Sequence, residues 1–205
     1  MIKDLDPRAI LQRPEAYVAF ARAVGTEKTR ERYVAEVLKV REGERILDIG
    51  CGPGYWLDYF PRVDYVGFDL SAPYIEYARN RYGDRAAFFA SALNADVAAS
   101  LEPFDLIVAN GVVHHLNDAE AELLFAVGRS SLKPGGRMVT VDGAFVEGQS
   151  PIARLIIRND RGEHVRKPKD YSELAKRSFA TVHCEVRHDL LRIPYTHCIL
   201  ECIAD

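Results

Sequence analysis

Residues 45–54 read Arg-Ile-Leu-Asp-Ile-Gly-Cys-Gly-Pro-Gly, and this stretch decides the fold. Its apolar half is short and is stopped by glycines, which is typical of a buried strand. The glycines that follow permit a sharp turn and let a ligand approach the backbone closely. Residues 55–60 then predict a helix that ends at Pro61. A strand, a glycine loop and a helix in this order indicate the first unit of an α/β fold.

The alternation of strands and helices continues along the chain. Further helical patterns lie at 30–40, 71–82 and 118–132. Further short apolar runs, each predicting a buried strand, lie at 64–68, 86–90, 104–109 and 137–141. Such alternation produces right-handed crossovers and a parallel sheet that is covered on both faces.

The end of the chain follows a different pattern. After a helix predicted over 171–178, residues 179–186 and 195–203 read as two more strands. The eight residues between these strands are too few for a helical crossover, so we expect the strands to be antiparallel. The sequence therefore predicts an α/β fold with a Rossmann-like, mostly parallel sheet of seven strands, a C-terminal antiparallel β-hairpin and helices on both faces.

Composition places limits on the class of protein. The chain has 205 residues, 48% of them apolar, and a formal net charge of −3. The length fits a single domain, and the apolar fraction excludes wholesale disorder. No apolar run reaches the roughly eighteen residues of a membrane span, and the N-terminus is too charged for a secretory signal. We therefore expect a cytoplasmic protein whose surface is not a general nucleic-acid coat.

The four cysteines suit a reducing compartment and free thiols. Cys198 and Cys202 stand four apart on a predicted strand, so both face the same side and are expected to be buried. A metal site that joins them to a nearby histidine is the alternative. Zinc favours more closely spaced cysteine pairs, so we predict no metal.

The glycine loop has the spacing G-x-G-x-G, which differs from the G-x-G-x-x-G of dinucleotide-binding folds and from a phosphate-binding P-loop. Asp48 precedes the loop, and its charge suits a ligand that carries a positive charge. Asp69 follows twenty-one residues later at the end of the next strand, where this class of fold reads ribose hydroxyls. Together these features describe a nucleoside with a charged amino-acid tail. The alternatives are that Asp48 braces the loop and that Asp69 caps the next helix, although Ser71 is better placed as a cap.

Four stretches in register resemble the class I S-adenosylmethionine-dependent methyltransferases of the small-molecule type. They are ILDIGCGPG at 46–54, VGFDLS at 66–71, FDLIVANGVVHHL at 104–116 and LKPGG at 132–136. Their order and separations match the family over 30–141, and the terminal strand pair fits its seven-stranded sheet. The resemblance implies S-adenosyl-L-methionine as the cofactor and methyl transfer as the reaction.

The resemblance also implies cofactor-binding residues. Backbone groups of the loop would line the methionine part above Asp48, Asp69 would bind the ribose hydroxyls, and Leu70 would pack on adenine. Many family members carry an acid at the position of Ser91, so the adenine edge would be met here by Ser91 and by the backbone of the next two residues. The implied cofactor-binding set is Asp48, Gly50, Cys51, Gly52, Asp69, Leu70, Ser91, Ala92, Leu93 and Asn110.

Methyl transfer to a hydroxyl needs a base, whereas positioning and exclusion of water supply most of the acceleration. His114 and His115 follow the fourth strand, where cofactor and acceptor meet, and a histidine near neutral pKa suits this task. We predict His115 as the catalytic residue, ahead of His114. The alternative is that a histidine here braces the loop.

Two segments outside the core are expected to lie over the site. In residues 1–29, Tyr17 recurs at helical spacing with Phe20 and Val24, either as part of a lid or as plain helix packing. Residues 154–169 carry six cationic and two acidic side chains, a local charge of +4. We predict that Tyr17, Arg158, Arg161 and Arg166 bind the substrate, against the alternative of a solvated basic loop.

We therefore expect one methyltransferase domain over 1–205. It comprises N-terminal lid helices at 1–29, a cofactor-binding core at 30–142, a substrate-side insert at 143–170 and a C-terminal helix and hairpin at 171–205. The expected acceptor is a hydroxyl group on an anionic or sugar-like small molecule, and the expected assembly is a monomer or homodimer. The alternatives are an RNA or protein methyltransferase and a catalytically silent cofactor-binding subunit. The stretch Asn110-Gly-Val-Val113 lacks the Asn-Pro-Pro-aromatic pattern of members that methylate base amines.

Overall fold

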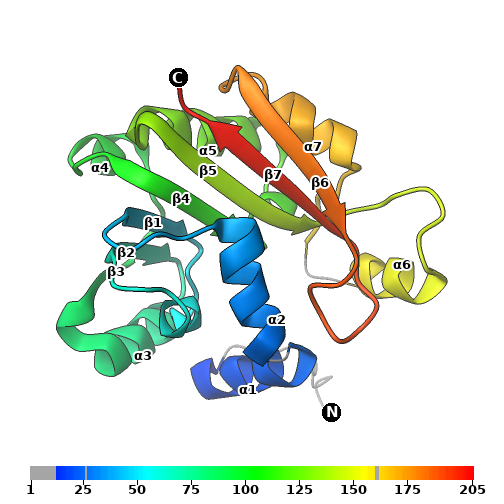
Figure 1. Cartoon of the computed structure of the whole chain (residues 1–205), viewed down its shortest axis with the longest axis horizontal. Coiled ribbons are helices and arrows are strands. Elements are labelled where there is room, and N and C mark those ends of the chain that lie inside the picture. The colour runs from blue at the N-terminus through cyan, green and yellow to red at the C-terminus, as the bar shows by residue number, and fades with distance from the viewer. Residues whose placement is uncertain (1–12, 26, 160–161) are drawn as a thin grey trace, which may run out of the picture.

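The computed structural model describes residues 13–25, 27–159 and 162–205, and Figure 1 shows their arrangement. Within these residues seven strands form one sheet in the order β3-β2-β1-β4-β5-β7-β6. The strands are β1 (Arg45–Ile49), β2 (Asp64–Asp69), β3 (Ala86–Ala90), β4 (Phe104–Asn110), β5 (Leu132–Gly143), β6 (Thr181–Arg187) and β7 (His197–Ile203).

The first five strands are parallel to one another, and β7 is antiparallel to both β5 and β6. The predicted fold class is confirmed. One difference concerns β5, which begins at Leu132 rather than at 137. Leu132 already pairs with Phe104, and a register shift between Phe104 and Leu106 absorbs the turn at 133–136.

The helices depart from the sequence prediction at four places. The pattern at 30–40 becomes α2 followed by a π-helical segment, Tyr33–Leu38, which ends at Lys39 with φ 52°. The expected helix at 55–60 is a 3-10 turn, Tyr55–Asp58. The sequence analysis also missed α4 and α6. The α-helices are α1 (Pro14–Val24), α2 (Glu27–Arg32), α3 (Ala72–Tyr82), α4 (Ala95–Ala99), α5 (Asp118–Ser131), α6 (Pro151–Arg158) and α7 (Pro168–Ala175). Single 3-10 turns occupy Gly83–Arg85 and Val113–His115.

Two buried clusters, one on each face of the sheet, hold the strands in place. Leu47 and Ile107 pack into one cluster, and their neighbours Ile46 and Leu106 pack into the other. This alternation along β1 and β4 is expected for central strands that are covered on both faces. Figure 1 shows α1 and α6 at the lower end of the sheet, where β4 and β5 finish. That edge is therefore the one that presents the carboxyl ends of the parallel strands.

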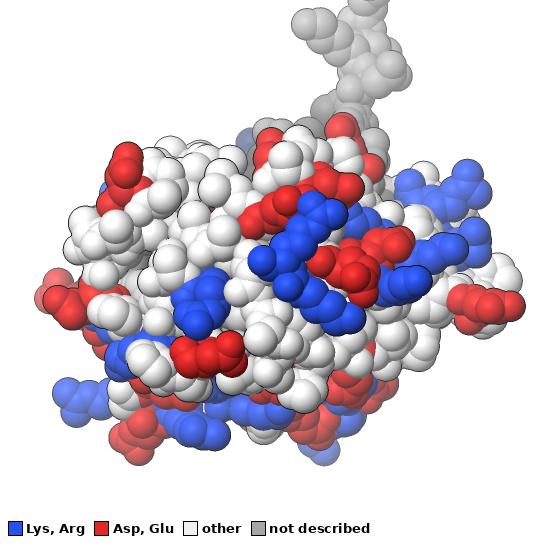
Figure 2. Space-filling view, turned by 90° about the horizontal axis from the view of Figure 1, so that it is seen from above, with Lys and Arg blue, Asp and Glu red and all other residues white. Residues whose placement is uncertain are grey.

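The surface carries charges of both signs. Figure 2 shows Lys and Arg interspersed with Asp and Glu over the face seen from above. Exposed ion pairs such as Lys176–Glu173, at 3.1 Å, join charges of opposite sign at the surface. The face in Figure 2 thus offers no continuous cationic surface. None of the described helices is long and apolar enough to cross a membrane.

Candidate functional site

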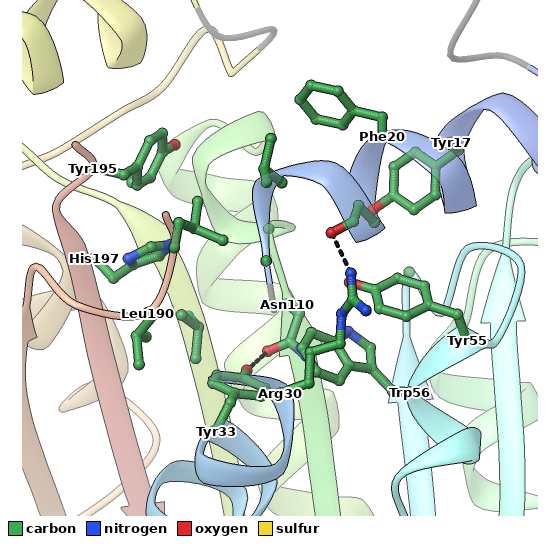
Figure 3. A pocket seen from close by; sticks show the side chains of 18 of the residues that line it. Tyr17, Phe20, Arg30, Tyr33, Tyr55, Trp56, Asn110, Leu190, Tyr195 and His197 are labelled. Atoms are coloured by element: carbon green, nitrogen blue, oxygen red, sulfur yellow. Dashed lines mark hydrogen bonds between the residues drawn. The ribbon is translucent and has the colours of Figure 1, made fainter. Parts of the chain in front are cut away.

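A cavity of about 580 Å³ opens at the carboxyl ends of the parallel strands. Its wall combines the glycine loop, α1, α2, the turn after β4 and the loop between β6 and β7. Figure 3 shows aromatic side chains on both sides of the space, with Asn110 between them. Segments far apart in the sequence therefore meet at one site.

The glycine loop is held by the neighbouring strand. The backbone N–H groups of Gly50 and Cys51 both donate to the carbonyl of Phe68, at 2.8 and 3.0 Å. Gly50 has φ 72°, and a Cβ there would lie 2.6 Å from Cγ2 of Val112. A side chain at position 50 is thus excluded both by backbone strain and by contact.

Asp69 is anchored beside this loop. Its Oδ2 accepts from the backbone N–H of Gly52 and its Oδ1 from that of Ser71, both at 2.8 Å. Ser71 is the N-cap of α3, because its side chain accepts from the N–H of Tyr74. Asp69 is therefore not needed as the cap, and its partly exposed carboxylate keeps lone pairs for a ligand. Leu70, 79% exposed, follows directly.

The turn after β3 lies next to Asp69, because Asp69 pairs with Ala90 in the sheet. Ser91 and Ala92 are exposed there, and Leu93 is half-buried. These three residues and Leu70 are outside the lining of the cavity. They form a neighbouring surface at the same edge of the sheet.

Asp48 is almost completely buried beneath the loop and lines the cavity. The hydroxyl of Tyr65 donates to its Oδ2 at 2.6 Å. Burial raises the pKa of Asp48 to about 7, and the hydrogen bond from Tyr65 only partly opposes this rise. A buried carboxylate with a pKa near neutrality favours a cationic ligand beside it.

Asn110 ends β4 at the centre of the cavity. The hydroxyl of Tyr33 donates to its side-chain Oδ1, as Figure 3 shows. Its Nδ2 is buried and has no hydrogen-bond partner among the described residues. A buried amide without an acceptor is costly, so a ligand oxygen at this point would be stabilised.

Arg30 is a site residue that the sequence analysis missed. Its guanidinium is buried at the cavity wall and donates to the hydroxyl of Tyr59 and to the carbonyl of Ala21. It lies 5.7 Å from the ring centroids of both Tyr55 and Tyr59. Among the described residues no carboxylate pairs with it. A buried cation with only neutral partners favours an anionic ligand group.

Trp56 is a second site residue that the sequence analysis missed. It lines the cavity, and its ring centroid lies 4.7 Å from that of Tyr33 and 4.8 Å from that of Tyr55, with the rings tilted in both pairs. The dipeptide Tyr55-Trp56 directly after the glycine loop was the available signal, and it was assigned only to a helix.

His114 and His115 both line the cavity, and their rings lie 4.2 Å apart. Buried His114 is fixed by Asp142, since its Nδ1 lies 2.8 Å from Oδ1 and its backbone N–H donates to the same atom. His115 is exposed. The geometry thus leaves His115 as the more accessible group and gives His114 a bracing contact. The catalytic role of His115 stays a prediction.

The expected substrate contact of Arg166 is not supported by its position. Its five guanidinium N–H groups are used within the protein, on Asp118 and on the carbonyls of Val113, Leu116 and His164. Arg166 lies outside the cavity lining, and its hydrogen bonds hold the turn that carries the two histidines. The sequence could not show this, because two of the carbonyls, those of Val113 and Leu116, are 53 and 50 residues away along the chain.

The other predicted substrate contacts have different outcomes. Arg158 is exposed and outside the cavity lining, so the structure does not bring it to the site. Arg161 lies outside the described residues. Tyr17 lines the cavity from α1, with its ring 5.5 Å from that of Tyr74 and 6.1 Å from that of Tyr55. Among the described residues, no three His, Cys, Asp or Glu side chains gather as metal ligands.

Comparison with known proteins agrees with this geometry. Residues 47–138, which hold the glycine loop, Asp69 and the turn after β4, match the family model described as a methyltransferase domain. The chain belongs to the class I S-adenosylmethionine-dependent methyltransferases. Its seven-stranded sheet, with the antiparallel strand β7 inserted between β5 and β6, is the Rossmann-like sheet of this family.

Two curated relatives of this chain have different acceptors in their names. It is 34% identical over 154 residues to the malonyl-[acyl-carrier protein] O-methyltransferase of Hahella chejuensis. The aligned region covers 72% of this chain and 53% of that protein. It is 31% identical over 133 residues to phosphoethanolamine N-methyltransferase 3 of Arabidopsis thaliana, covering 60% of this chain and 25% of that one. The chain thus spans about half or less of the length of these relatives.

Solved structures share the fold at low identity. The phosphoethanolamine N-methyltransferase 2 of Haemonchus contortus, solved with S-adenosyl-L-methionine, superposes with a TM-score of 0.70 at 16% identity, over 96% of this chain and 59% of that one. A TehB-like methyltransferase from Corynebacterium glutamicum superposes with a TM-score of 0.63 at 22% identity, over 97% of this chain and all of that one.

The buried carboxylate of Asp48 leads to a prediction about stability. The unfolded chain loses this proton near pH 4, whereas the folded chain holds it to about pH 7. The folded state is therefore penalised increasingly above pH 4, and fully above pH 7. Asp48→Asn should raise the free energy of unfolding of the ligand-free protein at pH 8 by on the order of 2–4 kcal/mol, with little change at pH 4. Urea denaturation at the two pH values measures this.

Asp105 supplies the matched control. Partial burial raises its pKa, but the Lys133 ammonium and the backbone N–H of Arg45 lower it by more. The net result is a pKa below the ordinary value of an aspartate. Asp105→Asn should therefore destabilise the protein at pH 8, the opposite sign. A loss of stability at pH 8 in Asp48→Asn would contradict the buried-carboxylate interpretation.

Proposed function

We propose that this protein transfers the methyl group of S-adenosyl-L-methionine to a hydroxyl group of a small-molecule acceptor. The observation that carries the proposal is the position of Asp69. Both its oxygens are fixed by backbone N–H groups beside the glycine loop, at the same edge of the sheet as the cavity, although Asp69 itself is outside the cavity lining. A carboxylate held in this way suits the paired hydroxyls of a ribose.

The residues present fit the cofactor group by group. The methionine tail carries a carboxylate, an ammonium and a sulfonium. The unpaired Nδ2 of Asn110 and the guanidinium of Arg30 suit the carboxylate, and buried Asp48 suits the cationic part. Exposed Leu70 and the turn at Ser91, Ala92 and Leu93 provide a surface for adenine. The backbone of Gly50, Cys51 and Gly52 lies between these two ends.

When bound, the cofactor would supply an activated methyl group: the bond from the acceptor oxygen to the methyl carbon would form as the carbon–sulfur bond breaks, and S-adenosylhomocysteine would leave. This chain contributes binding, alignment and exclusion of water. Tyr17 of α1 closes one side of the cavity against Tyr55 and Tyr74. We propose that His115 takes the proton from the acceptor hydroxyl, with its turn held by His114–Asp142 and by Arg166.

A small acceptor suits the cavity volume of about 580 Å³, which the methionine part would share. The expectation of an anionic or sugar-like acceptor rested on Arg158, Arg161 and Arg166. Because Arg166 is satisfied internally, its side chain gives no support to a negative charge on the acceptor. The relatives named above have different acceptors, so the comparison does not identify the acceptor of this chain.

The ribose assignment is tested by calorimetry with S-adenosylhomocysteine. Asp69→Asn should weaken binding at least tenfold, because the carboxylate loses charge-assisted hydrogen bonds to the hydroxyls. Asp64→Asn, at the opposite end of β2, is the matched control and should bind like the parent. Equal affinities of parent and Asp69→Asn would remove the basis of the proposed function.

The carboxylate assignment of Arg30 has its own test. Arg30→Gln should weaken S-adenosylhomocysteine about tenfold and leave 5′-methylthioadenosine, which lacks the amino-acid tail, unchanged. Arg32→Gln is the control, since Arg32 lies two residues further on the same helix in exposed ion pairs. An equal loss for both ligands would show that Arg30 only supports the wall.

The role of His115 is tested with a hydroxylated acceptor found by screening. His115→Gln should lower the rate of methyl transfer by about 10²–10⁴-fold and abolish the acidic limb of the pH–rate profile, while S-adenosylhomocysteine affinity stays unchanged. His183→Gln, on exposed β6, should change neither quantity. Retained turnover in His115→Gln would show that the acceptor loses its proton without this residue.

A further inference from the structure

One side of the cavity is built from the end of the chain and has no role in the account above. The loop between β6 and β7 contributes Leu190, Leu191, Ile193 and Tyr195, and β7 contributes His197. Figure 3 shows Tyr195 and His197 across the space from Tyr55 and Trp56, with Leu190 beside Tyr33 below them. We call these five residues of the loop and β7 the C-terminal wall.

The charged side chains among the described lining residues lie on the side of the cavity opposite the C-terminal wall. Among the described lining residues, Arg30 and Asp48 are the only Lys, Arg, Asp or Glu side chains. Arg30 lies against Tyr55, directly after the glycine loop, and Asp48 lies beneath that loop. The C-terminal wall consists of aliphatic and aromatic side chains and one histidine. A phosphate or carboxylate placed against it would lose hydration without an ionic partner, which is costly.

His197 gives this wall a single polar point. It pairs with Gly143 at the end of β5, and its ring lies 4.7 Å from that of Tyr195. The Nδ1 atom is shielded from solvent and has no hydrogen-bond partner among the described residues. Burial lowers the pKa of His197 to about 4; Asp189 opposes this shift and His188 adds to it, so the imidazole is neutral at neutral pH.

Flat side chains border the space on both sides. Tyr195 and His197 form one ring pair, and Tyr33 and Trp56 form the other at 4.7 Å. Such surfaces favour a planar apolar body, because ring contacts add to the free energy of apolar burial. A single hydrogen bond to a neutral imidazole would orient that body.

We infer that the C-terminal wall binds an uncharged, planar aromatic acceptor between these two ring pairs, with a polar group of the acceptor hydrogen-bonded to His197. This inference rests on the proposed function, since it assigns the other half of the cavity to the methyl donor. It replaces the anionic acceptor that the basic segment suggested.

The test uses the protein saturated with S-adenosylhomocysteine and two probes that share one ring system. Calorimetric titration should show that 2-naphthol binds at least tenfold more tightly than 2-naphthyl phosphate. His197→Phe keeps the ring and removes the nitrogen atoms, so it should weaken 2-naphthol about fivefold, the worth of one net hydrogen bond. His183→Phe, on exposed β6 outside the cavity lining, is the matched control and should bind as the parent does.

The outcomes separate this inference from the proposed function. Equal or tighter binding of 2-naphthyl phosphate by the parent overturns the inference without recourse to any variant. Unchanged 2-naphthol affinity in His197→Phe overturns the role of His197, provided that the variant retains parental affinity for S-adenosylhomocysteine as evidence of folding. Failure of the parent to bind S-adenosylhomocysteine overturns the proposed function, and with it this inference.

Discussion

The site depends on how the end of β2 holds the loop that follows β1. The carbonyl of Phe68 accepts from two successive loop N–H groups, and Asp69 accepts from a third at Gly52. This arrangement needs glycine at position 50, because only glycine takes this conformation without meeting Val112. The same loop covers Asp48 and leads directly into Tyr55 and Trp56. The geometry of the loop therefore positions both the carboxylate of Asp48 and these two aromatic side chains.

Two isolated charges distinguish this site from an ordinary protein interior. Asp48 is buried with a raised pKa, and Arg30 is buried with only neutral partners among the described residues. Each lowers the stability of the ligand-free fold, because a buried charge without a counter-ion loses hydration. Charges arranged at this cost are typical of functional sites. A zwitterionic ligand tail would compensate both at once, which gives the two residues a common explanation.

Much of the fold was predictable because its elements are local. Short apolar runs predicted the parallel strands, and the eight-residue link predicted the antiparallel pair at the end. The errors arose where distant partners decide the structure. The π-helical segment Tyr33–Leu38 carries the Tyr33 hydroxyl that donates to Asn110, a contact across 77 positions. A helical repeat alone does not reveal such a contact.

The sequence by itself determined the sheet, the glycine loop and the positions of Asp48 and Asp69, because spacing along one strand–loop–strand unit places these groups. Only the tertiary structure decided which side chains complete the cavity. It brought Arg30 and Trp56 to the wall, set His197 opposite them and directed Arg166 to the carbonyls of the 113–116 turn. The physical reason is that hydrogen-bond and charge partners are chosen by proximity in space. A cationic segment therefore looks the same in sequence whether its arginines meet a ligand or the chain's own backbone.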